Sequence, residues 1–386
     1  MMPILFLFVG EPHHIFHALP IAAEMAAAGS DIEVAVASAA HLRMVDQVAL
    51  AYPGFDPRVT LLGQRGISRW LRTSGLVHHP RLPLLVEALP FLRQFDAIVV
   101  PERTTTAIRH FLPRRTRLIF TPHGAGDRAI TFDARDRHFH FALVAGEKSE
   151  QRMLQEGTIR PGQYAVNGYV KLDLMRKLDK QRAPLFANDR PTILYAPHFR
   201  RDLSSWDRFG RAIIAWFAGQ DLYNLVVAPH IRLFAEASDA EIDAVMRLAV
   251  PDKIAIDLQS DRLFDMSYTS GADIYLGDVS SQVYEFLATP RPCLFLNAHG
   301  TDWPGDPDYL FWTLGDVIDD LDALPDALDA APTRHSLYAD RQRERLAESI
   351  GGDPAGAARR GAEAIARFLA TARFLAKDTV QDKSGG

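Results

Sequence analysis

The chain has 386 residues, more than one domain usually contains, so two α/β domains are the natural expectation. Its hydrophobic content of 47% and charged content of 24% are ordinary for a soluble globular protein and sufficient for two cores. The formal net charge of -5 gives no reason to expect nucleic acid as the main partner.

The single cysteine and the first apolar run bear on the cellular compartment. Cys293 falls inside a predicted strand and has no second cysteine to pair with, which fits a reducing cytoplasmic setting. The run from Pro3 to Val9 is too short to span a membrane and ends without a small-residue cleavage site. We therefore interpret it as a first strand and not as a signal peptide. No other stretch is long and apolar enough to cross a bilayer, and peripheral membrane contact stays open.

The first half of the chain alternates apolar runs with helical patterns. The strand Ile4 to Val9 leads through a histidine-rich loop into a helix from Leu19 to Ala28, and a second strand, Ile32 to Ala37, follows at once. This βαβ opening is of Rossmann type, although it lacks the G-x-G-x-x-G fingerprint. The further strands expected in this half are Phe95 to Val100, Leu118 to Thr121 and Phe139 to Val144.

The second half repeats the alternation. The segment Lys171 to Asp189 is polar and contains a proline, so we place the domain boundary there. The expected strands are Thr192 to Ala196, Leu225 to Ala228, one ending near Asp257, Ile274 to Leu276, and Arg291 to Asn297. The expected helices are Arg208 to Phe217, Ala240 to Leu248 and Gln282 to Ala288. The prediction is an α/β fold of two Rossmann-like domains, at residues 1–178 and 179–355. A helix at 356–376 that packs on a domain and a disordered tail at 377–386 follow.

Three strands of the second domain end in residues that can bind phosphate. Ligands in open α/β sheets bind outside the carboxyl ends of the strands. Arginine offers a planar fork to phosphate oxygens, and a helix that starts at a serine adds backbone N–H donors. Each residue alone is better explained as a turn residue or a helix cap. Together they predict an anion site, with these candidates: His198, Arg200, His230, Asp278, Ser280 and Ser281.

The first domain has one comparable strand end, the loop from Thr121 to Arg128. Its His123 titrates near neutrality and is a candidate general base, and Gly124 lets the backbone approach a ligand closely. The alternative is an exposed loop histidine without a catalytic role. His17, Gly124 and Arg128 are further candidates for a cleft between the domains.

Metal binding has little support in the sequence. Asp306 and Asp308 have a D-x-D spacing, but the neighbouring proline and glycine indicate a surface turn. His13, His14 and His17 are close together, but no cysteine or carboxylate completes a zinc pattern. We therefore expect no metal. The serine pair also lacks a G-x-S-x-G elbow, so a hydrolase triad is not indicated.

Five motifs, in this order, resemble the CDP-glycerol glycerophosphotransferases, the teichoic-acid polymerase and primase family. The family's His-Gly-x-x-x-Lys segment is similar to His123-Gly124, and its Gly-x-Pro-x-x-Asp segment to Gly168 through Asp173. Its Ala-Pro-Thr-aromatic-Arg, Pro-His and Asp-Tyr-Ser-Ser segments are similar to Ala196 through Arg200, Pro229-His230 and Asp278 through Ser281. The resemblance covers roughly half of the chain, and the Asp-x-Ser-Ser block is its most specific part.

The resemblance implies GT-B architecture, two Rossmann-like domains facing across a cleft. It implies that His123 activates an acceptor hydroxyl, while His230, Arg200 and the serines hold the donor pyrophosphate. Three positions depart from the family pattern and leave acceptor and donor identity open. Asp127-Arg128 stands where a lysine is expected, His198 replaces threonine, and Val279 replaces tyrosine.

The function expected from the resemblance is a metal-independent, cofactor-free transferase in cell-surface polymer synthesis. It would move glycerol phosphate, or a related polyol phosphate, from a CDP-linked donor to a hydroxyl of a glycan or lipid-linked acceptor. One alternative is a GT-B glycosyltransferase or epimerase acting on a nucleotide sugar, and another is a non-catalytic nucleotide-sugar or polysaccharide-binding module. The expected location is cytoplasmic, with peripheral contact at the inner face of the cell membrane left open.

Overall fold

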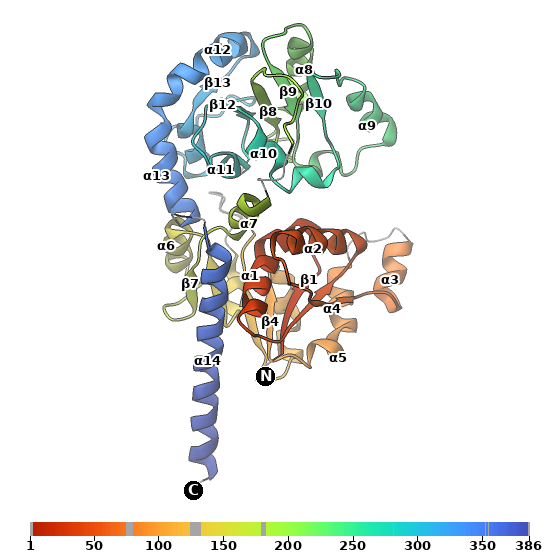
Figure 1. Cartoon of the computed structure of the whole chain (residues 1–386), viewed down its shortest axis with the longest axis vertical. Helices are drawn as coiled ribbons and strands as arrows, with labels where there is room; N and C mark the ends of the chain where they lie inside the picture. The colour runs from red at the N-terminus through yellow and green to blue at the C-terminus, as the bar shows by residue number, and fades with distance from the viewer. Residues whose placement is uncertain are drawn as a thin grey trace. The chain divides into compact units, whose positions relative to one another are not determined.

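The computed structural model describes residues 3–74, 80–123, 133–178, 183–280, 282–351, 353 and 355–384 (Figure 1). The chain divides into two compact units. The first unit comprises Met1–Ala125, Phe132–Leu178 and Glu348–Gly386, and the second comprises Gly126–Thr131 and Asp179–Ala347. The main division falls after Leu178. The second unit ends at Ala347 and not at residue 355, because the chain then returns to the first unit: Lys148 Nζ donates to Ser349 Oγ at 2.8 Å.

The first unit is built on a seven-stranded parallel sheet in the order β3-β2-β1-β4-β5-β6-β7. Its strands are β1 Ile4–Phe8, β2 Ile32–Val36, β3 Arg58–Leu61, β4 Ala97–Val100, β5 Arg117–Phe120, β6 Phe141–Val144 and β7 Tyr164–Val166. The central strands β1 and β4 are completely buried apolar runs, as a parallel sheet covered on both faces requires. The edge strands β3 and β7 are partly exposed and lack such runs, which is why the sequence did not predict them.

Helices surround this sheet. They are η1 Pro12–His14, α1 Ile15–Ala27, α2 Ala39–Ala51, α3 Gly66–Thr73, α4 Arg81–Glu87, α5 Leu89–Leu92, η2 Arg103–Phe111, η4 Ala134–His138, α6 Glu147–Gln155, α7 Val170–Leu178 and α14 Ala357–Ser384. Helix α1 begins at Ile15 and not at Leu19, because the short helix η1 runs directly into it. His17 consequently lies on a helix and not in a loop.

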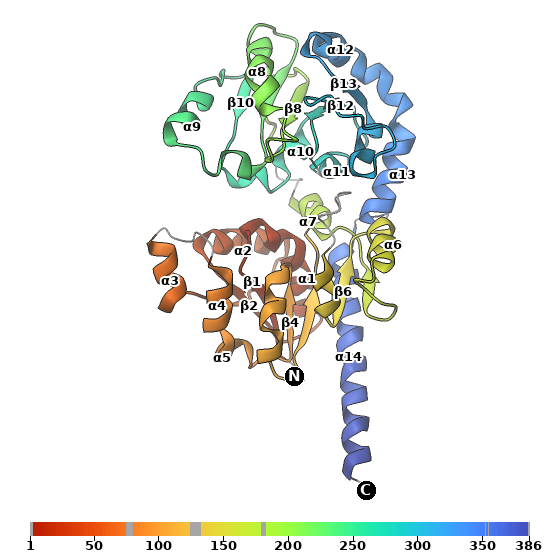
Figure 2. The same cartoon turned by 180° about the vertical axis from the view of Figure 1, so that it is seen from behind.

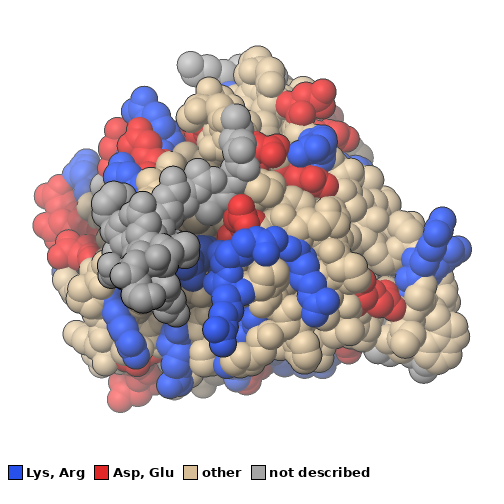
Figure 3. All heavy atoms as spheres, turned by 90° about the horizontal axis from the view of Figure 1, so that it is seen from below, with Lys and Arg blue, Asp and Glu red and all other residues tan. Residues whose placement is uncertain are grey.

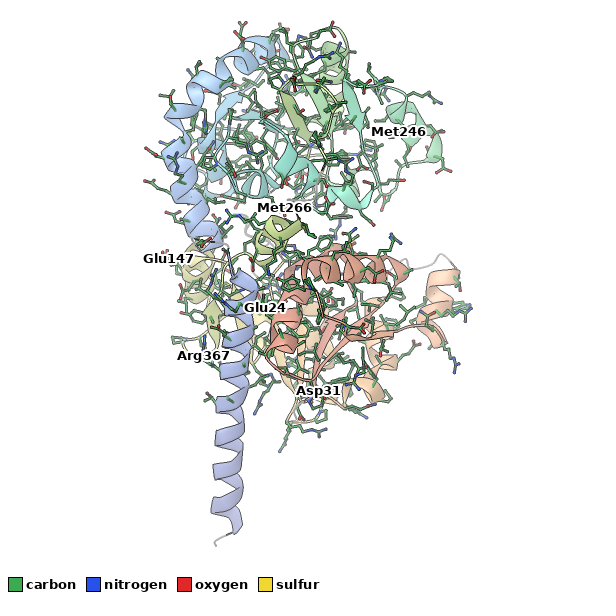
Figure 4. The ribbon with its side chains drawn as sticks, viewed as in Figure 1. Glu24, Asp31, Glu147, Met246, Met266 and Arg367 are labelled. Carbon is green, nitrogen blue, oxygen red and sulfur yellow. The ribbon has the colours of Figure 1, made fainter. Side chains whose placement is uncertain are left out.

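Surface ion pairs fasten some of these elements at their edges. Glu24 on α1 accepts a hydrogen bond from Lys177 on α7 at 3.4 Å, and Asp31 before β2 pairs with Arg58 on β3 at 3.1 Å. Figure 4 shows Glu24 and Asp31 on the first unit. Exposed pairs of this kind contribute little to stability, so the buried apolar runs hold the unit together. Seen from below, several Lys and Arg side chains lie next to one another near the centre of the view, and others lie at its left and right edges (Figure 3).

The second unit is built on a six-stranded parallel sheet in the order β10-β9-β8-β11-β12-β13. Its strands are β8 Thr192–Ala196, β9 Asn224–Val227, β10 Ile254–Ile256, β11 Ile274–Gly277, β12 Cys293–Leu296 and β13 Asp316–Ile318. Its helices are η6 Trp206–Gly210, α8 Arg211–Ala218, η7 Ile231–Phe234, α9 Asp239–Met246, η8 Asp261–Leu263, α10 Ser267–Gly271, α11 Gln282–Phe286, η9 Pro307–Leu314, η10 Leu321–Ala323, α12 Leu324–Arg334 and η11 His335–Leu337. Helix α13 Ala339–Ile350 follows and crosses the division at Ala347.

Alternate residues of these strands form two cores, one on each face of the sheet. Ile193 and Tyr195 pack with residues of α8 and α12, while Leu194 and Ala196 pack with residues of α10 and α11. This is the period-two alternation of a strand buried on both sides. The predicted βαβ unit is confirmed: α11 connects β11 to β12, and these strands pair in parallel. Figure 2 shows the helices around this sheet from behind.

The long helix α14 packs on the first unit, as its apolar face predicted. The rings of Phe141 on β6 and Phe368 on α14 stack with centroids 4.7 Å apart. Asp173 on α7 accepts the backbone N–H groups of Gly356 and Ala358 at 3.0 and 3.1 Å, so it caps this helix. The segment Gly168 to Asp173, singled out by its resemblance, therefore has a structural role in docking α14.

The end of α14 differs from its prediction. Residues 377–384 were expected to be disordered, but the helix continues to Ser384, since residues 377–384 contain no glycine or proline that would end it. Arg367, labelled on α14 in Figure 4, is exposed and pairs with Glu363 at 3.7 Å. Among the described helices, none is long and apolar enough to cross a membrane.

Each sheet has one point where its strand order reverses. In the first unit β1 is followed by β2 and β3 on one side and has β4 on the other, so the reversal lies between β1 and β4. In the second unit it lies between β8 and β11. Open α/β sheets bind their ligands outside the carboxyl ends of the strands at such switch points. The residues after these four strands are therefore the first to inspect.

Candidate functional site

Glu102 and Gly10 meet at the switch point of the first unit. Phe6 pairs with Val99, so the residues after β1 and β4 lie at the same level of the sheet. Glu102 Oε1 accepts the Gly10 N–H at 2.9 Å, and the glutamate is only 4% exposed. A Cβ atom at position 10 would lie 2.6 Å from this oxygen, so the approach requires glycine.

Two histidines adjoin this carboxyl group. His14 Nδ1 lies 3.3 Å from Glu102 Oε1, and the His14 ring stacks on His123 with centroids 3.8 Å apart and an interplanar angle of 28°. His123 follows β5, and its side chain is exposed. The structure thus brings the predicted base together with two buried residues from other strand ends.

The tautomer of His123 follows from its backbone contact. Its Nδ1 lies 2.9 Å from the carbonyl oxygen of Pro101, which can only accept, so Nδ1 donates. In neutral imidazole the lone pair is then on Nε2. This nitrogen is the one that a general base would use.

His17 belongs to the same cluster. It is 5% exposed on α1, and its ring makes edge contacts with His123 at 6.5 Å and with Tyr169 at 5.4 Å. Burial lowers its pKa well below the usual histidine value, and the nearby Lys171 ammonium lowers it further. His17 is therefore neutral at cellular pH. His13 makes an edge contact with His14 at 4.7 Å and completes a group of four histidines.

Burial also governs the charges of Glu102 and His14. It raises the pKa of Glu102 to about 7, against the opposing effect of the Gly10 N–H and the Arg81 charge. It lowers the pKa of His14 well below its usual value, and the other histidines and Arg81 act in the same direction. Glu102 Oε2 is buried and has no hydrogen-bond partner among the described residues. At neutral pH this carboxyl group therefore exists in both protonation states.

The switch point of the second unit is organised by Asp278. This residue is completely buried directly after β11, and Ala196 at the end of β8 pairs with Gly277. Its carboxylate accepts the N–H groups of His198, Ser205 and Val279 and the Ser205 hydroxyl, at distances of 2.6 to 3.1 Å. Burial raises the pKa of Asp278 to about 6, and these donors oppose the rise. Asp278 therefore ties the loop after β8 to β11, and its predicted contact with a donor stays a prediction.

His198 and His230 have the opposite tautomer to His123. His198 Nδ1 accepts the Arg200 N–H at 3.1 Å, and His230 Nδ1 accepts the Arg232 N–H at 3.2 Å. In both neutral rings the proton is then on Nε2, which is a hydrogen-bond donor. Their centroids lie 6.0 Å apart, and the Phe199 ring lies within 4.6 Å of both. Two separate sequence motifs thus meet in one aromatic group with N–H donors.

Two arginines beside this group, Arg200 and Arg232, each contact a neighbouring side chain. Arg200 pairs with Asp202, and both side chains are exposed. Arg232 lies over the Phe199 ring, 5.6 Å from its centroid. Planar guanidinium groups at a site with histidine N–H donors can bind the oxygens of a phosphate.

Ser280 is buried, and its hydroxyl accepts the Gln282 N–H at 3.4 Å at the start of α11. The capping role that the sequence left as an alternative is therefore present for this serine. Helix α11 has five residues. Ser281, Gly124 and Arg128 lie outside the described residues, so their predicted roles stay predictions.

The described residues contain no group of three or more histidine, cysteine or acidic side chains that could hold a metal ion. Asp306, one half of the D-x-D spacing, accepts the Asp308 N–H at 2.8 Å and caps η9. A cavity in the second unit lies near the amino ends of β8 and β11 and includes Arg190, Arg262 and Asp273 in its lining. It contains none of the predicted donor-site residues.

Sequence reasoning missed Glu102, Ser205 and Phe199. Glu102 directly follows the apolar run of β4 and a proline, so a signal was present. What the sequence lacked was the strand order, because only the β1–β4 adjacency makes this strand end the switch point. Ser205 lies in a loop whose contact with Asp278 depends on tertiary packing.

No protein-family model matches the chain, and no curated protein matches it. Solved structures do. The UDP complex of S. aureus MnaA matches with a TM-score of 0.60 and 14% identity, over 93% of this chain and 94% of that one. The wall teichoic acid polymerase TagF soaked with CDPG matches with 0.64 and 12%, over 96% and 89%.

The UDP-GlcNAc 2-epimerase from Neisseria meningitidis bound to UDP-GlcNAc matches with a TM-score of 0.60 and 15% identity, over 95% of this chain and all 100% of that one. Identities this low establish the fold alone. That the two domains face across a cleft, and that the chain belongs to the CDP-glycerol family, stay predictions. The chain is an α/β protein of two Rossmann-like domains with the GT-B fold, as its sequence predicted.

Proposed function

We propose that the protein is a transferase that uses a nucleotide-diphospho donor. Its preferred reaction is transfer of glycerol phosphate, or a related polyol phosphate, from a CDP-linked donor to a hydroxyl of a glycan or lipid-linked acceptor. Such a reaction serves the synthesis of a cell-surface polymer. The proposal needs no metal or organic cofactor.

The meeting of three sequence motifs at one switch point carries this proposal. Ala196 through Arg200, Pro229-His230 and Asp278 through Ser280 are separated in the chain, yet they adjoin at the carboxyl edge of one sheet. The contacts are the hydrogen bond from the His198 N–H to Asp278 and the 4.6 Å ring contact of Phe199 with His230. These are the motifs that resemble the donor site of the glycerophosphotransferases. TagF, which is named as a wall teichoic acid polymerase, is among the structures with this fold.

The chemistry of this edge suits a donor pyrophosphate. His198 and His230 offer Nε2–H donors, and Arg200 offers a guanidinium group. In the proposed step, the acceptor oxygen bonds to the phosphorus of glycerol phosphate, and the bridging oxygen leaves with CMP. The negative charge that develops on CMP is stabilised by these donors.

The first unit supplies the base in this proposal. His123 Nε2 takes the proton of the acceptor hydroxyl as the new O–P bond forms, while Nδ1 stays bonded to the Pro101 carbonyl. This fixed backbone bond holds the ring in the basic tautomer. The proposal therefore requires the two switch points to act on the same donor and acceptor.

A second candidate is an epimerase or glycosyltransferase that acts on a nucleotide sugar. The observation that favours it is the buried pair of Glu102 and His14, in which burial raises the pKa of the acid to about 7 and lowers that of the histidine. A carboxyl group that titrates near neutrality can both give and take a proton, as an epimerisation at a carbon atom requires.

Two measurements decide between these candidates. Thermal stabilisation by CDP, UDP and GDP ranks the bases, since a ligand that binds the folded state raises the melting temperature. Incubation with CDP-glycerol and a polyol-phosphate primer then tests the reaction. Release of CMP supports the preferred reaction. Release of UDP or GDP from nucleotide sugars, or their epimerisation without release, supports the second candidate. No stabilisation by any nucleotide contradicts both.

A further inference from the structure

Glu102 occupies a position where a charged side chain is expensive. It is almost fully buried at the switch point, and Gly10 is shaped around one of its oxygens while the other has no hydrogen-bond partner among the described residues. A buried polar group that is incompletely hydrogen-bonded destabilises the folded state. Capping or packing requires no carboxyl group here, because the Gly10 N–H could equally donate to an amide oxygen. The acidity of Glu102 needs a separate explanation.

The His14 ring connects Glu102 with the proposed base. Its Nδ1 lies 3.3 Å from Glu102 Oε1, and its face lies against His123 at 3.8 Å. A buried ring between two groups excludes water, so charges on either side of it interact with less dielectric screening than in water. We propose that Glu102 is a positioning residue that provides the counter-charge for the His123 imidazolium, acting through the His14 ring.

The surrounding charges show why a counter-charge is needed. His13 and His17 contact the cluster through η1 and α1, Lys171 acts on it from α7, and Arg81 from α4. Lys171 and Arg81 are positive, and positive charge disfavours a further proton on a histidine of this cluster. Glu11 also acts on Glu102, but its carboxylate pairs with Arg81 at 3.1 Å. Glu102 is thus an acid placed to offset the remaining positive charge.

This inference rests on the proposed function, in which His123 takes a proton from the acceptor. When that proton arrives, the positive ring favours the ionised form of Glu102, and the negative charge in turn stabilises the ring. No proton passes through His14 in this account, since the rings of His14 and His123 stack and are not hydrogen-bonded to each other. Glu102 acts by charge alone and does not touch the substrate.

The test is an NMR titration of the histidine rings in the full-length protein, with His123 assigned by comparison with His123→Ala. In Glu102→Gln, which keeps the shape and the bond to the Gly10 N–H, the midpoint of the His123 titration should fall by about one pH unit. Glu102→Asp should restore most of it. Glu147→Gln, a surface change on the same unit, should leave it unchanged. An unshifted midpoint in a folded Glu102→Gln protein overturns the proposal.

A second measurement applies if Glu102→Gln does not fold. In wild-type protein with labelled glutamate carboxyl carbons, Glu102 and His123 should each show a two-step curve, because coupled groups report one another's titration. Two independent single-step curves contradict the proposal.

Turnover separates this inference from the function on which it rests. Glu102→Gln should lower kcat about tenfold with KM for the donor unchanged, since one pH unit corresponds to a factor of ten. If the His123 midpoint moves but wild-type protein transfers nothing, the inference stands and the proposed function fails. If transfer occurs at the wild-type rate in Glu102→Gln, the inference fails and the function stands.

Discussion

The two switch points contain the same residue types but use them differently. In each, a buried acid follows a central strand and histidines lie beside it. Asp278 accepts four donors from its own unit, whereas Glu102 accepts the Gly10 N–H and has a second buried oxygen with no hydrogen-bond partner in the described part of the chain. The hydrogen bonds of Asp278 therefore connect the loop after β8 to β11. Glu102 has fewer hydrogen bonds that would fix its protonation state.

The histidines show the same contrast. Backbone N–H groups donate to Nδ1 of His198 and His230, which leaves a proton on each Nε2. A backbone carbonyl accepts from Nδ1 of His123, which leaves a lone pair on its Nε2. One site is thus prepared to donate hydrogen bonds to an anion, and the other to accept a proton. The backbone at each strand end selects the chemistry of the side chain.

The largest effect is expected from replacing the proposed base at the switch point of the first unit. His123→Ala should lower turnover about a hundredfold to ten-thousandfold, the usual loss when a general base is removed. Donor affinity should barely change, because His123 is not assigned to the pyrophosphate. Steady-state kinetics and calorimetry measure the two quantities, and His110→Ala, an exposed histidine of the same unit, is the matched control. Near-normal turnover in His123→Ala would assign this histidine to an ordinary loop.

The next effect compares the two acids through the pH dependence of stability. Their folded pKa values, about 7 for Glu102 and about 6 for Asp278, exceed unfolded values of about 4.3 and 3.9. The folded state thus binds more protons, so the stability that each contributes is present below the unfolded pKa and is lost as pH rises through the folded one. The loss is about 4 kcal/mol for Glu102 and about 3 kcal/mol for Asp278, since one pKa unit corresponds to about 1.4 kcal/mol.

Urea unfolding at pH 4 and pH 8 checks this sign. Between pH 4 and pH 8 the free energy of unfolding of Glu102→Gln should rise relative to that of wild type, because glutamine does not ionise and the loss of stability from Glu102 no longer occurs. Asp278→Asn should show a similar gain relative to wild type between pH 4 and pH 8. Its free energy of unfolding should nevertheless be lowered at both pH values by the loss of hydrogen bonds, since one amide oxygen cannot satisfy all the donors. His14 and His17, whose pKa values are lowered, contribute the opposite slope. A Glu102→Gln protein whose stability follows the wild-type curve would refute the raised pKa.

A smaller effect tests the second site as an anion site. Arg200→Ala should weaken nucleotide binding by about 1.5–3 kcal/mol, the value of a hydrogen bond to a charged group. Arg201→Ala is the control, because its neighbouring guanidinium group is exposed and pairs with Asp207 at 3.8 Å. Calorimetry with the nucleotide that stabilises the protein most measures both. Equal affinity in wild type and Arg200→Ala removes this residue from the site.

The smallest expected effect is none at all. Turnover should be unchanged by EDTA, because histidine N–H donors and arginine can stabilise the leaving phosphate. Activity lost with EDTA and restored by magnesium or manganese would be inconsistent with this account. Asp306 and Asp308 would then be the first residues to replace.

Sequence patterns predicted the central elements well because their physical signal is local. The apolar runs Ile4 to Val9 and Thr192 to Ala196 appear as β1 and β8, and the turn at Asp278 lies between β11 and α11 as expected. The edge strand β3 escaped prediction because it is partly exposed and lacks an apolar run. The tail also differed, since α14 extends to Ser384.

The site was less predictable because its chemistry depends on strand order and on backbone contacts. Nothing in the local sequence shows that Glu102 lies beside Gly10, since the strands β2 and β3 and several helices lie between β1 and β4 in the chain. The tautomers of His123 and His230 depend on which backbone atom faces each ring. Sequence could nominate these histidines, and three-dimensional contacts were needed to distinguish a proton acceptor from a donor.

The division of labour between the switch points can be observed directly by ¹⁵N NMR of histidine-labelled protein at a pH where the rings are neutral. The account predicts that His123 carries its proton on Nδ1, while His198 and His230 carry theirs on Nε2. The three rings are assigned from the single alanine variants. The same tautomer at all three positions, or the reverse assignment, would contradict the claim that one site accepts a proton and the other binds an anion.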